Sequence, residues 1–307
     1  MKKNKLVSYC LFTYNQEEYI RESIEGALNQ AYSPMEIIIS DDCSSDRTVE
    51  VIEQTLENYS GPHKIIVNKN QQNLGIGGHF SKVCYTIAKG DYIIILGGDD
   101  ISYKEHVEQA VSIIEENPTV TMIDFNAEII NKHGVFVKNN DLDFNFKKFT
   151  LDDYLDLRKL SHFAPGRILR KSLIDSFEPL LESCQTEDLV LVVRSLLMGG
   201  FIRVNKPLLK YRKHDASLST VEGLSKFSNF TIIAQHLKDS IFLFDKGLID
   251  EKTSIFLLKR ISLELKLRDL KFSPSKNYVH AKCKLIYVDL LGYKFQVEKW
   301  LKNGGKR

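Results

Sequence analysis

The sequence lacks the patterns of disulfide-rich secreted proteins and of membrane-spanning proteins. Its five cysteines are scattered and none forms a C-x-x-C pair, so reduced thiols in a cytoplasm fit better than a disulfide framework. No run of 18 uncharged apolar residues occurs, and the apolar run after the basic start is too short for a signal peptide. With only 7 prolines and 27% charged residues, we expect a cytoplasmic globular protein.

Two common nucleotide-binding motifs are also missing. Glycines 75, 77 and 78 do not have the G-x-G-x-x-G spacing, and they follow the third predicted strand rather than the first. No G-x-x-x-x-G-K-[ST] motif occurs. These absences exclude hydride transfer with a dinucleotide and the P-loop class of enzymes.

Charge is distributed unevenly along the chain. Residues 252–307 contain 14 Lys and Arg against 4 Asp and Glu, whereas the remaining residues are acidic overall. A basic tail on an acidic body suggests an anionic partner such as a membrane surface, a nucleic acid or a phosphorylated acceptor. A solvated helical face explains the same composition equally well.

The first hundred residues alternate between strand and helix patterns. Short apolar runs predict strands at 5–12, 35–42, 63–70 and 91–100. Apolar residues at helical spacing predict helices at 16–30, 44–59 and 77–90. Strands that alternate with helices of this length predict βαβ units, and therefore an α/β fold with a mostly parallel, Rossmann-like central sheet flanked by helices.

The pattern loosens in the rest of the chain. We expect a helix at 102–118, a strand at 120–131, a loop-rich stretch at 134–165, and a helix at 187–199. A pair of strands is expected at 201–214, divided by Pro207, and the chain from 221 onward reads as helical.

Polar residues follow each of the first four predicted strands, and adjacent carboxylates, Asp99 and Asp100, follow the fourth. Each group alone is explained as a turn or a helix cap, but ligands of open α/β sheets bind at this edge. Adjacent carboxylates raise each other's pKa unless a cation neutralises them. Mg²⁺ and Mn²⁺ accept such oxygen ligands together with phosphate oxygens, so the pair predicts a metal and a phosphorylated ligand.

Four segments resemble, in order, the motifs of inverting family-2 glycosyltransferases with the GT-A fold. They are "LFTYN" through "ISDDCSSDRT", "NLGIGGHF" through "LGGDD", "TEDLVLVVR" and "PLLKYRKHDASLS". The resemblance implies a GT-A catalytic domain at 1–220, with a nucleotide-sugar half at 1–100 and an acceptor half at 101–220. A basic, mainly helical C-terminal region would follow at 221–307.

The family's pattern also implies ligands and residue roles. The donor would be a nucleotide-sugar, with UDP as the family's usual nucleotide, and the acceptor a glycan or a lipid-diphosphate-linked saccharide. Mn²⁺ or Mg²⁺ would be the cofactor, bound by Asp100. Arg212 and His214 would contact the diphosphate. The nucleotide site would consist of Thr13, Tyr14, Asn15, Asp42, Asn73 and Asp99.

Catalysis is assigned by the same resemblance to Asp188 as the general base, with Glu187 orienting it or contacting the acceptor. The alternative is that both acids merely cap the helix that follows. Arg167 is a further candidate, for an acceptor phosphate. We expect His79 or Lys82 to replace an arginine that the family has between its third and fourth strands.

One departure weakens the metal assignment, because Gly97-Gly98 stands where the family commonly has an acid before the paired acids. A binding module without turnover is therefore an alternative to an enzyme. A nucleotidyltransferase is less favoured, since "FTYNQEE" is no glycine-rich loop. For the C-terminal region 221–307, docking to the inner leaflet of the plasma membrane, chiefly through 252–307, a homodimer contact and packing on the core stay open. No nucleic-acid partner is expected.

Overall fold

A computed structural model describes residues 4–272, apart from 157, 159, 216, 218, 219, 221, 222, 224 and 226. The chain divides into two compact units. The first comprises Met1–Leu151 and Ser161–Ser217, and the second comprises Asp152–Leu160 and Leu218–Arg307. The predicted site residues all belong to the first unit.

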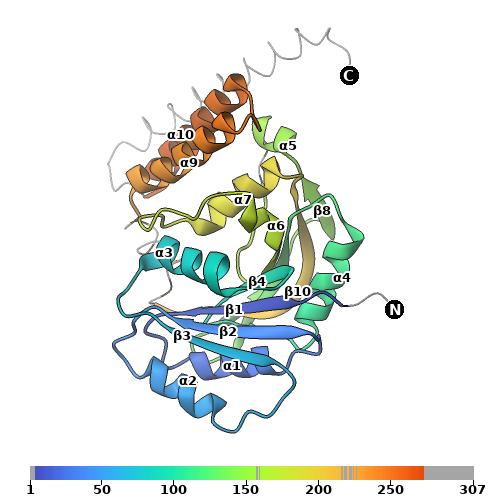
Figure 1. Cartoon of the computed structure of the whole chain (residues 1–307), viewed down its shortest axis with the longest axis vertical. Helices are drawn as coiled ribbons and strands as arrows, with labels where there is room; N and C mark the ends of the chain where they lie inside the picture. The colour runs from blue at the N-terminus through green and yellow to red at the C-terminus, as the bar shows by residue number, and fades with distance from the viewer. Residues whose placement is uncertain are drawn as a thin grey trace. The chain divides into compact units, whose positions relative to one another are not determined.

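The first unit begins with alternating strands and helices, as the sequence predicts (Figure 1). In chain order these are β1 (Val7–Thr13), α1 (Ile20–Leu28), β2 (Met35–Asp41), α2 (Thr48–Leu56), β3 (Lys64–Lys69), α3 (Gly75–Ser81), a π-helical segment η1 (Lys82–Ile87) and β4 (Tyr92–Gly97). Strands β3, β2, β1 and β4 pair in parallel, in that order. Their carboxyl ends therefore lie at one edge of the sheet.

The same sheet continues with mixed pairing in the second half of the unit. The elements of this half are β5 (Ile101–Ser102), α4 (His106–Glu116), β6 (Met122–Asn131), β7 (Phe136–Asn139), β8 (Phe146–Phe149), β9 (Arg167–Arg170), α6 (Lys171–Asp175), α7 (Glu187–Leu197) and β10 (Phe201–Lys213). Between β8 and β9, α5 (Leu151–Leu155) belongs to the second unit from Asp152 onward. Strand β9 is antiparallel to both β4 and β6, whereas β10 runs parallel to β6. The predicted α/β fold class is confirmed, and its parallel pairing is concentrated in the first half.

Three local predictions differ from the structure. The expected strand pair at 201–214 is one 13-residue strand, and its register against β6 shifts on both sides of Pro207, which has no N–H for the ladder. The helix expected at 77–90 continues beyond α3 as a π-helical segment. The stretch 134–165, expected to be loop-rich, contains β7, β8 and α5.

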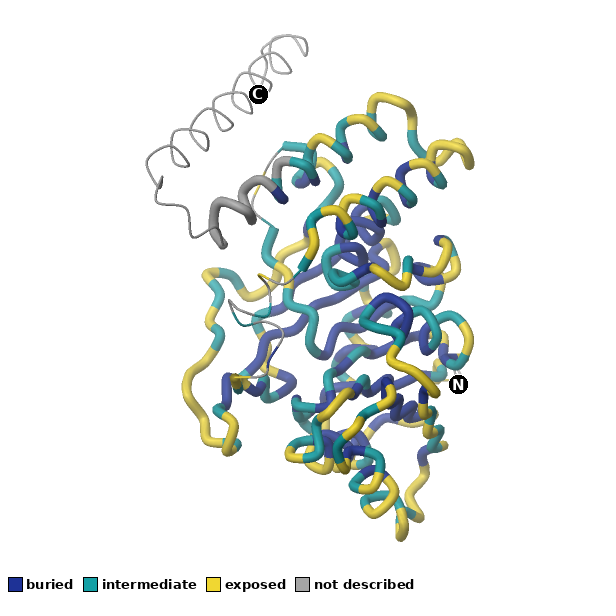
Figure 2. The backbone as a smooth tube through the Cα atoms, turned by 90° about the vertical axis from the view of Figure 1, so that its left-hand side faces the viewer, coloured by how far each residue is buried: buried dark blue, intermediate teal, exposed yellow. Residues whose placement is uncertain are grey.

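Helices cover both faces of the parallel strands. Helices α1 and α2 lie on one face and α3 on the other (Figure 1). Helices α1, α2 and α4 pack their apolar residues into one core with alternate residues of the strands, for example Ile24, Ile52, Ala110 and Ile39. Strands β1, β2, β4 and β6 are accordingly buried along most of their length, whereas β3, β7 and β8 are mostly half-buried or exposed (Figure 2). A rigid sheet of this kind holds the loops at its edge in fixed positions.

The second unit is built on two helices, α9 (Asn229–Asp245) and α10 (Glu251–Phe272), as the helical pattern predicts. Ile232, Ile261 and Leu265 form its apolar core, and the guanidinium of Arg260 lies 5.1 Å from the ring of Tyr154. Within the part of the chain that is described, no helix is long and apolar enough to cross a membrane. The predictions for 273–307 lie outside the described residues.

Candidate active site

The loops that follow β1 and β2 are joined by hydrogen bonds. Asn15, in the left-handed backbone region with φ of 50°, donates its main-chain N–H to Ser44 Oγ and accepts from the N–H of Ser45, both at 2.8 Å. Asp41 in turn accepts from the N–H of Ser44 at 2.9 Å. The exposed ring of Tyr14 lies next to this junction in the chain, free to contact a ligand.

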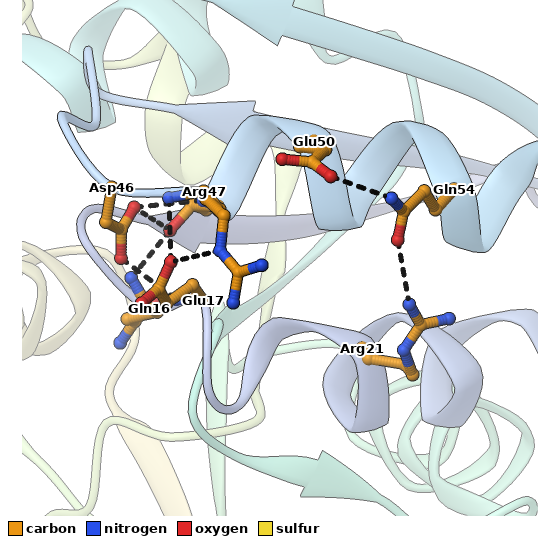
Figure 3. Close-up of polar contacts among 8 residues, drawn as sticks. Gln16, Glu17, Arg21, Asp46, Arg47, Glu50 and Gln54 are labelled. Atoms are coloured by element: carbon orange, nitrogen blue, oxygen red, sulfur yellow. Dashed lines mark hydrogen bonds and ion pairs between the residues drawn. The ribbon is translucent and has the colours of Figure 1, made fainter.

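The start of α2 extends the same junction (Figure 3). Asp46 accepts hydrogen bonds from the N–H and hydroxyl of Thr48 and from the N–H of Glu17, at 2.6 to 3.1 Å. These hydrogen bonds lower the pKa of Asp46, although desolvation acts to raise it. Glu17 accepts from the main chain and side chain of Arg47. The residues of "ISDDCSSDRT" thus fix the loop that carries Thr13, Tyr14 and Asn15.

Asp42 is buried and holds the loop that follows β3. Its carboxylate accepts from Asn70 Nδ2 at 2.7 Å and from the N–H groups of Leu74 and Gly75 at 2.9 and 3.0 Å. Asn73 accepts from the same N–H of Gly75 at 2.9 Å. The structure therefore brings two predicted nucleotide-binding residues, Asp42 and Asn73, together at the start of α3.

Two residues were expected to replace the arginine that the family has between its third and fourth strands, and both lie in the same region. Lys82 donates to Asn70 Oδ1 at 2.8 Å, next to Asp42. His79 is buried, with Nε2 2.6 Å from Ser40 Oγ, and desolvation lowers its pKa although Asp42 and Asp41 act in the opposite direction. Lys82 is thus the cation beside Asp42, whereas His79 forms part of the core.

Two buried oxygen atoms near the end of β1 have no hydrogen-bond partner among the described residues, Thr13 Oγ1 and Gln16 Oε1. Gly98 lies against both residues: a Cβ added there would be 2.9 Å from Thr13 Cβ and 2.5 Å from Gln16 Oε1. The glycine therefore lets the loop after β4 approach β1 closely. Unpartnered buried oxygens at such a point suit a polar ligand or an ordered water.

Asp99 and Asp100, after β4, occupy different environments. Asp100 is buried, and its Oδ1 accepts the main-chain N–H of Arg212 at 2.9 Å. Desolvation, followed by the charge of Asp99, raises the pKa of Asp100 well above its usual value. Asp99 remains partly exposed, with Oδ2 3.0 Å from His214 Nε2. A cation is the natural complement of two such carboxyls.

A divalent ion fits this pair only with help from its ligand. Among the described residues, no group of three or more His, Cys, Asp or Glu side chains is arranged to hold a metal. Mg²⁺ and Mn²⁺ are often bound by one or two carboxylates together with phosphate oxygens. Asp99 and Asp100 fit that mode of binding.

Arg212 holds the loop that carries these acids. It is buried, and its Nε donates to the carbonyl of Asp99 at 2.9 Å while its Nη1 donates to the carbonyl of Lys132 at 3.3 Å. Its Nη2 forms an ion pair with Glu22, and the guanidinium lies 5.0 Å from the ring of Tyr19. These contacts give Arg212 a positioning role, and diphosphate binding by this residue stays a prediction.

Glu187 and Asp188 begin α7, as the capping pattern predicts. Arg167 donates to the carbonyl of Asp188 at 3.0 Å and forms a buried bidentate ion pair with Asp124, at 3.0 Å for both contacts. The expectation that Arg167 faces an acceptor phosphate is therefore wrong, because its guanidinium is buried and paired. Desolvation, followed by the charge of Asp188, raises the pKa of Glu187 to about 8.

Strand pairing connects the two acidic groups. In the antiparallel pair β4–β9, Arg167 lies opposite Ile95, only a few residues before Asp99. A buried chain of hydrogen bonds adds a second link, from Ser102 Oγ to His106 Nδ1 at 2.8 Å and from His106 Nε2 to the carbonyl of Gly166 at 2.8 Å. The site thus has two groups of acids, one after β4 and one at the start of α7, and both are connected to the same sheet.

The sequence reading missed Asp124 as the partner of Arg167, and Glu22 and Tyr19 as partners of Arg212. A signal exists for Asp124, because a charged residue inside the apolar run "TMIDF" must be paired when that strand is buried. Nothing comparable marks Glu22, which lies on a helix with other acids and is paired only in the folded chain.

Comparisons with known proteins show the family to which the chain belongs. A family model described as "Glycosyl transferase family 2" matches residues 8–177. The uncharacterized glycosyltransferase MJ1057 of Methanocaldococcus jannaschii is 29% identical over 236 residues, which cover 74% of this chain and 78% of that protein. Abequosyltransferase RfbV of Salmonella typhimurium is 29% identical over 189 residues, covering 56% of this chain and only 55% of that protein.

Solved structures show the same fold at low sequence identity. TarS 1–349 of S. aureus, in complex with UDP-GlcNAc, superposes with a TM-score of 0.61 at 19% identity, covering 89% of this chain and 74% of TarS 1–349. The mannosyltransferase PcManGT of Pyrobaculum calidifontis, in complex with GDP-Man and Mn²⁺, has a TM-score of 0.55 at 13% identity, covering 97% and 84% of the two chains.

Proposed function

Because the chain belongs to glycosyl transferase family 2 and has the GT-A fold, we propose that it transfers a sugar from a nucleotide-sugar to a saccharide acceptor, with inversion at the anomeric carbon. The observation that carries the proposal is the carboxyl pair Asp99–Asp100 after β4, of which Asp100 is buried, connected through the sheet to Glu187–Asp188 at the start of α7. One pair suits a cation and a diphosphate, and the other suits proton transfer.

On the donor side, Tyr14, Asn15, Asp42 and Asn73 bind the nucleotide in this proposal. The unpartnered oxygen of Thr13 receives a donor group of the ligand. Asp99 and Asp100 hold Mn²⁺ or Mg²⁺, which would neutralise the charge on the departing diphosphate. His214, 3.0 Å from Asp99, lies beside the diphosphate, and Arg212 keeps both acids in place.

On the acceptor side, Asp188 takes the proton of the acceptor hydroxyl. The acceptor oxygen forms its bond to the anomeric carbon as the bond from that carbon to the diphosphate oxygen breaks on the opposite face. Glu187, with a pKa of about 8, is mostly protonated near pH 7 and donates a hydrogen bond to the acceptor or to Asp188. Arg167 holds the first turn of α7, and therefore the base, in a fixed position by its hydrogen bond to the carbonyl of Asp188.

UDP is the proposed nucleotide, because TarS binds UDP-GlcNAc and its fold matches over 89% of this chain. The acceptor is a glycan or a lipid-linked saccharide in this proposal, in line with one relative, which is named hyaluronan synthase, of Pasteurella multocida. The chain covers only 23% of that protein, so its product is not carried over.

A second candidate is a binding module that holds a nucleotide-sugar without turnover. The observation that favours it is the lack of a three-residue metal site among the described residues. The two candidates agree on donor binding and differ on catalysis by Asp188.

The test is release of nucleoside diphosphate from a panel of UDP- and GDP-sugars, with Mn²⁺, with Mg²⁺ and with EDTA, alongside calorimetric titration of each donor. We expect release from one donor that needs the metal, is lost in Asp100→Ala, and falls at least a hundredfold in Asp188→Asn with donor binding retained. The matched control is Asp175→Asn, which removes an exposed carboxylate from a surface ion pair. Donor binding without release in any variant or acceptor mixture would favour the binding module. Absence of donor binding would refute both candidates.

A further inference from the structure

Helix α9 of the second unit has its apolar and polar faces reversed. The residues it buries are mostly polar and include Gln235, His236, Asp239 and Ser240. Of the six residues that it exposes, Asp245 at its end is polar and the other five are large and apolar: Phe230 80%, Ile233 38%, Leu237 42%, Ile241 52% and Phe244 48%. A surface helix normally shows the opposite arrangement. An exposed face of this composition marks a contact surface.

These five residues, which we call the α9 stripe, form a palindrome in both spacing and identity. Their separations are 3, 4, 4 and 3 residues, and their order is Phe, Ile, Leu, Ile, Phe. The mean separation of about 3.5 residues is that of a left-handed coiled-coil seam. Reading the helix backwards therefore presents the same side chains at the same heights. Such self-complementarity is what an isologous two-fold interface requires.

We propose that the α9 stripe is the interface with a second copy of this chain, in which two α9 helices pack antiparallel around a two-fold axis at Leu237. In that register, Phe230 contacts Phe244 of the other copy, and Ile233 contacts Ile241 of the other copy. Each aromatic residue meets an aromatic residue and each isoleucine meets an isoleucine. The two contact layers on either side of the central Leu237 layer are therefore equal in size.

The exposed apolar area of the stripe supplies most of such a contact. With roughly 150–250 Å² for each large side chain, the exposed fractions of the stripe amount to on the order of 500 Å². Two copies would bury on the order of 1,000 Å² from these side chains alone, close to the lower limit of roughly 1,200 Å² for a stable interface. Leu248, 61% exposed just beyond the helix, adds to the apolar surface.

An anionic membrane fits the stripe less well. Helices that bind such surfaces carry Lys and Arg on the face opposite their apolar residues. In α9, that face is buried, and the helix contains one lysine, Lys238, against two aspartates, Asp239 and Asp245. Neither the charge nor the exposed face of α9 matches an anionic membrane. The stripe of a second α9 does match, because it has the same size and the same apolar character.

The experiment measures the mass of the full-length protein by sedimentation equilibrium from about 1 to 100 µM. We expect twice the chain mass of 35.3 kDa for the wild type. Leu237→Asp places two carboxylates against each other on the axis and should weaken dimerisation at least a hundredfold. The matched control is Phe136→Asp, at an equally exposed apolar residue of β7 in the first unit, which should leave the dimer intact.

Cysteine cross-linking tests the register, in a background with Cys43→Ser and Cys283→Ser. Leu237→Cys should form a disulfide between copies under mild oxidation, whereas Phe230→Cys alone should not. A parallel pair would cross-link through both single variants and would refute the antiparallel register.

A monomeric wild type at 100 µM would refute the dimer. Flotation of that monomer with phosphatidylglycerol vesicles, lost in Leu237→Asp, would assign the stripe to a membrane instead. The measurement involves no donor or activity, so it stands or falls separately from the proposed function.

Discussion

Substituting Glu187 by glutamine separates the roles of the two acids at the start of α7. Desolvation and the charge of Asp188 raise the pKa of Glu187 from 4.5 to about 8. Near pH 7 the wild-type side chain is therefore a hydrogen-bond donor, and glutamine preserves the shape and a donor group. We expect Glu187→Gln to keep activity near pH 7 within about tenfold, whereas Asp188→Asn removes the base and costs about 10²–10⁴-fold.

The pH dependence of the free energy of unfolding shows how large the effect of the Glu187 proton is. The folded chain holds the Glu187 proton more tightly than the unfolded chain does, so wild-type stability falls as pH rises from about 4.5 to about 8. At about 1.4 kcal/mol per pKa unit, full ionisation would cost on the order of 4–5 kcal/mol. Because Asp188 and solvent take up part of this cost, we expect the free energy of unfolding to fall by about 2 kcal/mol. Glu187→Gln has no such proton, so it should be more stable than wild type by that amount at pH 9 and nearly equal to it at pH 4.

Two assays check this reasoning. Urea unfolding at pH 4, 7 and 9 should show the stability difference growing with pH, and the pH profile of kcat/KM should fall above about pH 8 in the wild type only. The control is Glu182→Gln, an exposed residue five positions earlier, which should behave as wild type in both assays. If Glu187→Gln retained the alkaline fall in activity, or if its added stability did not depend on pH, a raised pKa for Glu187 would be refuted.

Other predictions concern the buried supports of the site. Asp124→Asn leaves the guanidinium of Arg167 buried without its carboxylate, so the free energy of unfolding should fall by about 3–5 kcal/mol in urea titrations. Asp175→Asn, which breaks an exposed ion pair, should cost below about 1 kcal/mol, and similar losses in the two variants would contradict the assignment. Gly98→Ala adds a methyl group 2.5 Å from Gln16 Oε1, so the loop after β4 must move. Calorimetry should show donor affinity reduced at least tenfold in the folded variant, and unchanged affinity would mean that this loop does not contact the donor.

The alternation of apolar runs with helical spacing was enough to predict the first half of the fold. Residues 7–97 form β1 to β4 and their helices nearly where the sequence places them, because each element is encoded by its own local pattern. The second half was harder to predict. Strands β7 and β8 are short and mostly exposed, so they carry little apolar signal, and they form by pairing with β6 and β10.

Candidate site residues were predicted unequally well. Acids at strand ends are visible in the sequence because a parallel sheet gathers those ends at one edge, so Asp42, Asp99 and Asp100 could be named in advance. The direction of each side chain could not. Arg167 was expected to face an acceptor, and it is instead buried against Asp124, 43 positions earlier, because an arginine's partner depends on which strands become neighbours.

By itself, the sequence determined the α/β class, the family motifs and the carboxylates around which a sugar-transfer site is proposed, since strand, helix and turn patterns act over a few residues. Only the tertiary structure decided the surroundings of those carboxylates and which apolar surface stays exposed. It buries Asp100 beside Arg212, raises the pKa of Glu187 to about 8 and leaves the palindromic face of α9 exposed. Each of these outcomes depends on burial, and the contact of Asp100 with Arg212 also joins residues 112 positions apart in the chain, which local sequence patterns do not specify.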